Sequence, residues 1–325
     1  MNGCGLVADA GGTNVRFALV DLGASAGPAL LGPRKFSSRD FSGIAEAARA
    51  YLEGNDVKPV MAVVSVAGPV RDNAIHMTNL GWNFSGQSLG AALDIPKIGL
   101  INDYEAIAMG IPVLAEADLR DVGPKIPANR ADRETVAVIG PGTGLGVGGY
   151  VRVKAQTIPL VAEGGHCDFA PWDDVEIEIL RTLQRKFGHV SNERVLSGPG
   201  LVNLHEALSD IEGVAPEKLG PHDITARAAQ DPGSHCGKVL ARFCSILGSV
   251  AGNVALTLGA RDGVMLAGGI LPAVADFLMG SDFRKRFEAK GRFEDYMKAI
   301  PTRLIVNDNA GMLGAATLVR AMAGR

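Results

Sequence analysis

Short apolar runs alternate with amphipathic stretches along most of this chain. Runs rich in Val, Ile, Leu and Ala are typical of buried strands, whereas apolar residues that recur every three or four positions indicate helices with one buried face. The pattern predicts strands at residues 5–9, 15–21, 59–67, 97–101, 135–139, 145–153, 156–161, 263–267 and 303–306. It predicts helices at residues 42–53, 86–93, 103–109, 174–187, 200–209, 223–229, 237–258 and 309–322. This alternation favours a mixed α/β fold.

A stretch rich in Pro, Gly and charged residues, 112–133, separates two groups of predicted elements. We expect it to cross into a second domain, and we expect the C-terminal helix to pack back on the first. The predicted division is a small α/β domain of residues 1–112 and 307–325 and a large α/β domain of residues 113–306. In the first predicted helix, Ser42 is the expected N-cap because its hydroxyl can accept a bond from an N–H group of the first turn.

The composition narrows the functional classes. The 325 residues have a formal net charge of −3, with 47% hydrophobic and 21% charged residues, which is typical of a soluble globular protein and gives no reason to expect nucleic-acid binding. No Lys/Arg run predicts a membrane patch, no apolar run reaches the ~18 residues of a spanning helix, and the N-terminus shows no signal-peptide pattern. The four cysteines form no C-x-x-C pair, so we expect free thiols and a cytoplasmic protein.

Two glycine-threonine loops, each between predicted strands, have chemistry that suits a polyphosphate. In the first, an apolar strand ends at Asp9 and the turn Gly11-Gly12-Thr13 follows; in the second, Gly142 and Thr143 follow a strand. Glycines let backbone N–H groups approach phosphate oxygens, and threonine adds a hydroxyl donor. A carboxylate at the strand end can hold Mg²⁺ directly or through water. The two loops therefore indicate one nucleotide held from two sides.

Asp103 follows a buried strand and stands beside Asn102. Ligands of α/β proteins bind at the carboxyl ends of strands, and a carboxylate there can accept a proton from a substrate hydroxyl during phosphoryl transfer. The alternative interpretation is a helix N-cap, because Asn and Asp both suit that position.

Three further polar or glycine-rich turns are candidates for ligand contacts. Glu163 and His166 flank a glycine pair and could bind a polyhydroxyl ligand, although a lone histidine in a turn is often structural. Glu193 lies in a polar, glycine-bounded segment and could accept hydrogen bonds from hydroxyls or cap a helix. Gly268 and Gly269 follow a buried strand and could let a base or ribose approach the backbone, or could form a turn without a ligand.

Two other nucleotide-binding signatures do not fit. Residues 144–149 match G-x-G-x-x-G, but the chain continues as a predicted strand where the dinucleotide fingerprint must open a helix. The P-loop pattern G-x-x-x-x-G-K-[ST] does not occur in the chain.

The order of these motifs resembles the actin/hexokinase-like ATPase superfamily, and most closely the bacterial glucokinases. The resemblance covers nearly the whole chain and is carried by residues 9–16, 76–85, 101–103, 142–146, 163–171, 188–200 and 266–269. It implies a two-lobed, ribonuclease H-like α/β fold with a ligand cleft between the lobes. It also implies ATP-dependent phosphorylation of D-glucose at its 6-hydroxyl to give glucose 6-phosphate and ADP, feeding glycolysis.

The resemblance also implies roles for individual residues. The ATP phosphates and Mg²⁺ would be held by Ala8, Asp9, Ala10, Gly11, Gly12, Thr13, Gly142 and Thr143, with Asp9 meeting the metal through water. Gly268 and Gly269 would lie against the adenosine. The sugar-binding positions would be Asn102, Asp103, Glu163, His166 and Glu193, with Asp103 as the catalytic base. The family further implies a homodimer.

Other functions remain open at this point. The same polar set could bind mannose, fructose or an N-acetylated hexosamine. A sugar-sensing regulator is a second alternative, but such relatives carry a helix-turn-helix segment before the first phosphate hairpin, and few residues precede it here. A nicotinamide-dependent enzyme is the third, and the strand that follows residues 144–149 argues against it.

Overall fold

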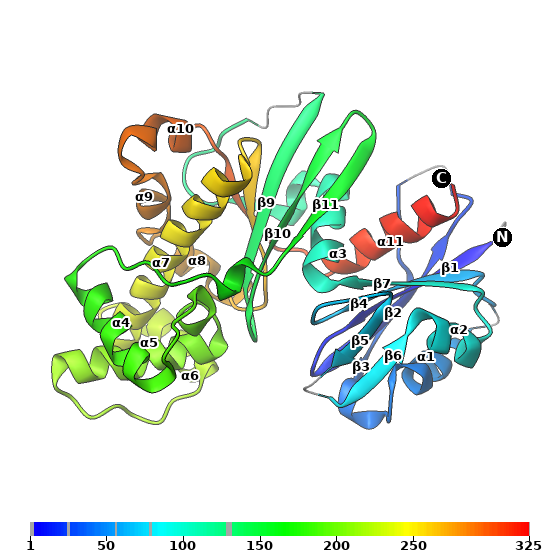
Figure 1. Cartoon of the computed structure of the whole chain (residues 1–325), viewed down its shortest axis with the longest axis horizontal. Helices are drawn as coiled ribbons and strands as arrows, with labels where there is room; N and C mark the ends of the chain where they lie inside the picture. Colours follow the sequence, from blue (N-terminus) through cyan, green and yellow to red (C-terminus); the bar gives the residue numbers. More distant parts are fainter. Residues whose placement is uncertain (1–2, 25–26, 56, 78–79, 128–131, 325) are drawn as a thin grey trace. The chain divides into compact units, whose positions relative to one another are not determined.

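The computed structural model describes residues 3–24, 27–55, 57–77, 80–127 and 132–324. Thr78 and Asn79 of the 76–85 motif, and residues 128–131 of the expected crossing, lie outside the described residues. The chain divides into two compact units (Figure 1). Unit 1 comprises Met1–Glu116, Ile158–Val161 and Asn307–Arg325, and unit 2 comprises Ala117–Thr157 and Ala162–Val306. Each unit contains one main sheet, and residues Ile158–Val161, from an edge strand of the second sheet, are grouped with unit 1.

The sheet of unit 1 has the strand order β3-β2-β1-β4-β7. Its strands are β1 (Cys4–Ala10), β2 (Asn14–Asp21), β3 (Leu31–Ser37), β4 (Met61–Val66) and β7 (Lys97–Asn102). The first three form an antiparallel meander, and β4 and β7 run parallel to β1. The register pairs Ala10 with Val66 and Val66 with Asn102, so the three parallel strands end in one row.

Helices cover both faces of this sheet. They are α1 (Ile44–Leu52), α2 (Gly86–Leu93), α3 (Asp103–Gly110) and α11 (Ala310–Met322), with a hairpin of β5 (Ala74–Met77) and β6 (Trp82–Ser85). Successive residues of β1 face opposite sides, as strand geometry requires: Leu6 packs in the core with α1, and Val7 packs in the core with α11. The expected packing of the C-terminal helix on the first sheet is confirmed.

Two details of these helices depend on particular residues. A Cβ atom on Gly314 of α11 would lie 1.7 Å from the carbonyl oxygen of Ala106 in α3, so the close contact between α3 and α11 requires glycine there. The expected N-cap at Ser42 is wrong, because Gly43 occupies that position. The Ser42 hydroxyl donates instead to Glu46 at 2.7 Å, since that carboxylate reaches back from the first turn.

The sheet of unit 2 repeats the arrangement of unit 1. Its order is β11-β10-β9-β12-β13-β8, with β11 (Gln156–Ala162), β10 (Leu145–Val153), β9 (Arg133–Pro141), β12 (Gly263–Leu266), β13 (Thr302–Ile305) and β8 (Leu119–Asp121). The β9–β10 hairpin is antiparallel, and β12 and β13 run parallel to β9, as β4 and β7 run parallel to β1. Tyr150 continues β10 as a strand, so residues 144–149 are not a dinucleotide fingerprint.

Unit 2 is otherwise helical. Its α-helices are α4 (Asp174–Phe187), α5 (Gly198–Glu212), α6 (Pro221–Gln230), α7 (His235–Leu258), α8 (Ala275–Met279), α9 (Phe283–Glu288) and α10 (Glu294–Lys298). Contrary to the expectation from the sequence, α7 is long and apolar enough to cross a membrane by length and composition alone. However, 67% of its most apolar window is buried, and Phe243 and Leu247 belong to the core of unit 2. Its packing is that of a core helix.

Candidate functional site

The turn between β1 and β2 is closed by its own backbone and by Ser38. The N–H of Gly11 donates to the carbonyl of Asn14 at 2.9 Å. Ser38 binds the turn twice, because its N–H donates to the carbonyl of Thr13 at 2.9 Å and its hydroxyl donates to the carbonyl of Gly11 at 3.0 Å. Thr13 is exposed and Gly12 is half-buried. These hydrogen bonds fix the conformation of the turn, and Thr13 at its tip is accessible to solvent.

Asp9 lies in β1 one residue before the end of the strand. The hydroxyl of Ser65 in β4 donates to its Oδ1 atom at 3.2 Å, and Arg16 is its partner across the hairpin. Burial raises the pKa of Asp9, and Arg16 and Ser65 partly offset that rise. Sequence reasoning missed Ser65, although a lone polar residue in the apolar run 61–66 was a signal. Ala8 and Ala10 are fully buried in β1, backbone included.

Asn102 and Asp103 lie on the same edge of this sheet. Asn102 is the N-cap of α3: its Oδ1 atom accepts from the N–H of Tyr104 at 2.8 Å, and its Nδ2 atom donates to the carbonyl of Gly68 at 3.0 Å. The N-cap interpretation therefore applies to Asn102, and Asp103 is the first residue of the helix. Asp9 lies in β1 and Asp103 directly follows β7. Because β1 and β7 are two strand spacings apart, these two acidic residues are separated by about 10 Å along the edge.

In unit 2, the two glycine turns lie side by side. The turn after β9 is closed by the N–H of Gly142, which donates to the carbonyl of Gly144 at 2.7 Å. A Cβ atom on Gly142 would lie 4.0 Å from the backbone nitrogen of Gly269. Gly268 has φ +87°, and a Cβ atom there would lie 2.3 Å from the carbonyl oxygen of Pro141. Position 268 thus requires glycine, and this close packing brings the predicted phosphate and adenosine turns together.

Glu193 reaches the same turn from the 3₁₀ helix η5 (Asn192–Arg194). Its Oε2 atom accepts from the N–H of Leu145, at the start of β10, at 2.9 Å. The alternative role as a helix cap does not hold, because Ser197 caps α5 and Glu193 lies before it. The hydroxyl of Ser197 donates to the carbonyl of Glu193 at 2.8 Å, which fixes its backbone. Glu193 is half-buried.

The turn that carries Glu163 and His166 is pressed against β10. Its 3₁₀ helix, η4 (Gly164–His166), packs so closely that a Cβ atom on Gly165 would lie 2.1 Å from the carbonyl oxygen of Leu145. The glycine pair is therefore a packing requirement. The N–H of Asn192 donates to the carbonyl of Cys167 at 2.8 Å, so this turn and the Glu193 segment are neighbours. Glu163 and His166 are both exposed.

The predicted site residues thus gather in two groups, one in each unit. Unit 1 holds the Asp9–Thr13 turn with Asn102 and Asp103 on one sheet edge. Unit 2 holds Gly142, Thr143, Glu163, His166, Glu193, Gly268 and Gly269 around the start of β10. Carboxylates beside backbone-lined turns suit a ligand with both hydroxyls and phosphates. Among the described residues, no group of three or more His, Cys, Asp or Glu side chains forms a metal centre.

Comparison with known proteins identifies close relatives. A family model described as Glucokinase matches residues 6–322. The chain is 48% identical over 316 residues to a protein named Glucokinase from Caulobacter sp. strain K31, covering 97% of this chain and 94% of that protein. It is 46% identical over 314 residues to a protein named Glucokinase from Xanthomonas oryzae pv. oryzae, covering 96% and 93%.

Solved structures show the same likeness. A glucokinase from an Antarctic psychrotroph matches with a TM-score of 0.87 and 36% identity, covering 98% of this chain and 99% of that chain. A glucokinase from Balamuthia mandrillaris in complex with glucose matches with a TM-score of 0.80 over 98% of this chain and 94% of that chain, and at 19% identity it supports the fold alone.

Proposed function

This chain belongs to the glucokinase family, and from that membership we propose how its residues divide the work of phosphorylating glucose with ATP. The finer fold proposal is an actin/hexokinase-like, ribonuclease H-like enzyme whose substrates bind in a cleft between a small lobe (1–112 and 307–325) and a large lobe (113–306). The matching strand orders of the two sheets support it, because each sheet offers a glycine-rich hairpin turn to a ligand.

The two hairpin turns hold the phosphates of ATP in this proposal. Gly11, Gly12 and Thr13 approach from unit 1, and Gly142 and Thr143 approach from unit 2. Their backbone N–H groups and hydroxyls can donate to phosphate oxygens. Gly268 and Gly269 lie against the adenosine, which their packing beside Gly142 supports.

Mg²⁺ fits beside Asp9. Oxygen donors are what this cation prefers, and it commonly keeps several waters while one carboxylate and the substrate phosphates hold it. Asp9 supplies the carboxylate, and Ser65 orients it. When bound, the ion neutralises charge on the transferred phosphoryl group.

The sugar is bound by Asn102, Asp103, Glu163, His166 and Glu193. A polar set shielded from water discriminates well between sugars, because an absent hydroxyl then leaves a protein group without its partner. Asp103 orients the 6-hydroxyl and takes its proton as the phosphoryl group moves. Phosphoryl transfer needs little covalent help, so placement and charge neutralisation supply most of the catalysis. We propose that the lobes close on the substrates, because closure excludes water as a competing acceptor.

One observation carries this assignment: the register that aligns Ala10, Val66 and Asn102 puts the phosphate turn and Asp103 on one sheet edge. Asp103→Asn should nearly abolish kcat while glucose affinity stays within an order of magnitude. Asp94→Asn, which changes a carboxylate with an 87% exposed side chain in the same unit, should keep wild-type turnover. A coupled ADP-release assay and glucose-binding calorimetry measure both effects. Retention of most of the turnover by Asp103→Asn would remove this residue from the role of base.

Substrate range, assembly and location complete the proposal. We propose a cytoplasmic homodimer that prefers glucose over mannose, fructose and N-acetylated hexosamines. A panel of these sugars in the ADP-release assay tests the preference, and a comparable kcat/KM for another hexose would reject it. Sedimentation equilibrium tests the dimer, and a monomer mass at micromolar concentration would reject it.

A further inference from the structure

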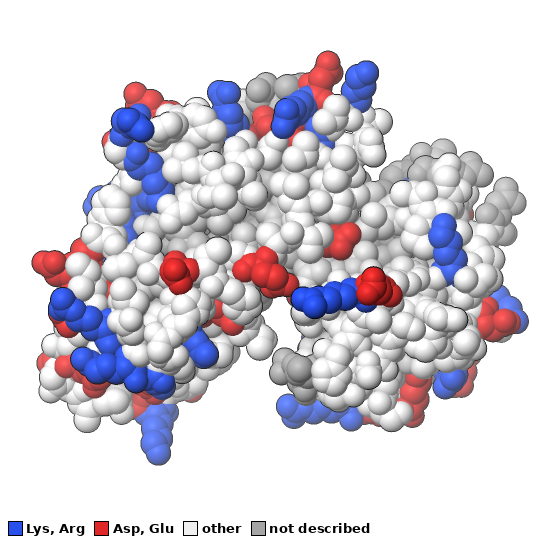
Figure 2. Space-filling model, in the orientation of Figure 1, with Lys and Arg blue, Asp and Glu red and all other residues white. Residues whose placement is uncertain are grey.

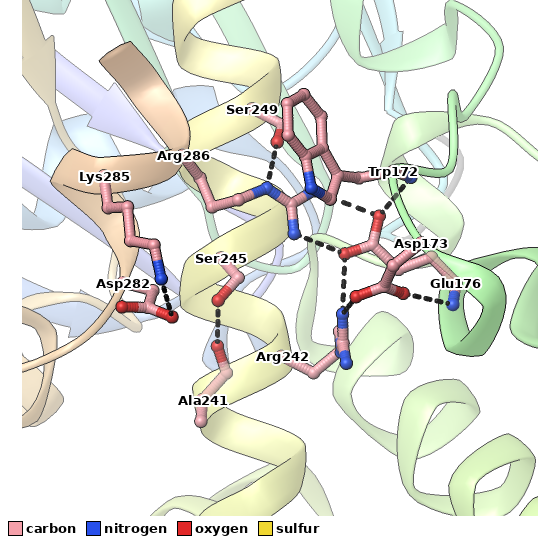
Figure 3. A network of polar contacts seen from close by, with 10 residues as sticks. All are labelled: Trp172, Asp173, Glu176, Ala241, Arg242, Ser245, Ser249, Asp282, Lys285 and Arg286. Atoms are coloured by element: carbon pink, nitrogen blue, oxygen red, sulfur yellow. Dashed lines mark hydrogen bonds and ion pairs between the residues drawn. The ribbon is translucent and has the colours of Figure 1, made fainter. Parts of the chain in front are cut away.

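Glu176 is a fully buried carboxylate that accepts four N–H groups (Figure 3). Its Oε1 atom accepts from the guanidinium groups of Arg242, at 3.0 Å, and Arg286, at 2.8 Å. Its Oε2 atom accepts from Arg286 at 3.1 Å and from the backbone N–H of Trp172 at 2.8 Å. Three segments, α4, α7 and α9, thus meet at one carboxylate, together with the chain that enters α4.

Arg286 is fixed on every side. Its Nε atom donates to the hydroxyl of Ser249 in α7 at 3.0 Å, and its guanidinium lies 5.0 Å from the centre of the Trp172 ring. The side chain of Arg286 is 8% exposed. A buried ion pair is often no more stable than well-packed apolar residues, so such a pair points to a role in holding one conformation.

That conformation includes the exit from the turn of Glu163 and His166. Trp172 directly follows residues 163–171. At its start, this turn packs closely against β10 through Gly164 and Gly165. In its middle, the N–H of Phe169 donates to the carbonyl of Val190 at 2.9 Å. The bond from Trp172 to Glu176 holds the exit.

We propose that the Glu176–Arg286 pair positions the turn 163–171, and thereby Glu163 and His166, for hexose binding. The inference rests on the proposed sugar-binding role of these two residues. Neither Glu176 nor Arg286 belongs to the groups assigned above to sugar or ATP contacts. Their effect on the reaction is therefore indirect and should appear in glucose affinity rather than in the chemical step.

Four variants of the full-length enzyme separate positioning from stability. Glu176→Met and Arg286→Met each break the pair. The double variant Glu176→Met/Arg286→Met replaces the pair by apolar side chains, which restores stability lost by the single variants but leaves the N–H of Trp172 without its acceptor. Lys285→Met is the matched control, because Lys285 directly precedes Arg286 on α9 and its side chain is 76% exposed (Figure 3).

Calorimetric titration with glucose alone gives Kd, steady-state assays give KM for both substrates and kcat, and thermal melts give Tm. We expect the single and double variants to raise the Kd and KM for glucose on the order of tenfold, with KM for ATP within about twofold, because a small misplacement of binding groups is costly. The double variant should recover Tm without recovering glucose affinity, and Lys285→Met should match the wild type. Wild-type glucose affinity in the folded variants would overturn the positioning role. Failure of Glu163→Gln and His166→Gln to weaken glucose binding would instead overturn the proposed sugar site.

Discussion

The Gly144→Ala substitution tests whether the turn after β9 sets the position of the Glu193 carboxylate. A Cβ atom at position 144 would lie 2.4 Å from Oε2 of Glu193 and 3.3 Å from its Cδ atom. Carbon and oxygen atoms in contact are normally about 3.3–3.6 Å apart. The carboxylate must therefore retreat by about 1 Å, which breaks its bond with the N–H of Leu145.

The size of the effect follows from the bonds that the carboxylate makes. A hydrogen bond to a charged group contributes about 1.5–3 kcal/mol. If displaced Glu193 loses one such bond to a glucose hydroxyl, glucose binding weakens by about 2 kcal/mol, which is roughly 30-fold in Kd at 1.4 kcal/mol per tenfold. The loss of the Leu145 bond should lower the free energy of unfolding by up to a similar amount.

A double-mutant cycle identifies the route of the effect. Glucose Kd is measured calorimetrically for Gly144→Ala, Glu193→Ala and the double variant. The methyl group should weaken binding in the wild-type background and change nothing once the carboxylate is gone. Gly142→Ala is the control within the same turn, because a Cβ atom there has no heavy atom closer than 4.0 Å, and it should leave glucose Kd unchanged. An equal loss of affinity from Gly144→Ala in both Glu193 backgrounds would refute the reasoning.

Three further predictions concern other described residues. Asp9→Asn should raise KM for ATP on the order of tenfold while KM for glucose stays within about twofold, as measured by steady-state kinetics. Burial and the neighbouring His235 lower the pKa of His205, so below about pH 6.5 the unfolded chain binds more protons than the folded one. The free energy of unfolding should therefore decrease as the pH is lowered through this range. Urea unfolding should show a smaller decrease for His205→Gln. Iodoacetamide should modify the exposed Cys167 before Cys244, whose pKa burial raises to about 12, and saturating glucose should slow modification of Cys167, as peptide mass spectrometry can measure.

The elements with strong local periodicity could be predicted from the sequence. The predicted helices at 86–93 and 174–187 and the strand at 145–153 have the same bounds in the structure. In these segments the apolar residues repeat at the helical or strand period, and the ends carry N-caps: Ser85 before α2 and Asp173 before α4 accept N–H groups of the first turn. Local chemistry and burial agree there, so the local pattern was sufficient.

Elements that depend on a partner could not be predicted this way. β3 contains Gly32, Pro33, Arg34 and Lys35, all exposed, and forms because it pairs with β2. β8 lies in the expected crossing and is only three residues long, yet it pairs with β13. Neither segment has an apolar alternation, because an edge strand with an exposed surface does not need one. Their structure comes from hydrogen bonds to a neighbouring strand that a local pattern does not contain.

In the candidate site, too, the residue types could be predicted from the sequence, but the contacts between them could not. Residue types and turn glycines indicated which positions could bind phosphate or hydroxyls. The bond from Ser65 to Asp9 depends on the register of β4 against β1, and the bond from Leu145 to Glu193 joins residues 48 positions apart. Such contacts follow from the arrangement of the sheet, which composition and spacing along the chain do not specify.

One short sequence does recur at the same place in the two sheets: an Ala-Gly pair directly after a parallel strand. β4 ends at Val66 and is followed by Ala67-Gly68, and β12 ends at Leu266 and is followed by Ala267-Gly268. Each alanine N–H donates to the neighbouring hairpin strand, and each glycine has positive φ, +141° and +87°. Glycine adopts a positive φ at little cost, and at position 268 it also allows close packing, because a Cβ atom there would lie 2.3 Å from the carbonyl oxygen of Pro141. These two Ala-Gly pairs therefore occupy equivalent places in the two units, at the end of the parallel strand that lies beside each hairpin.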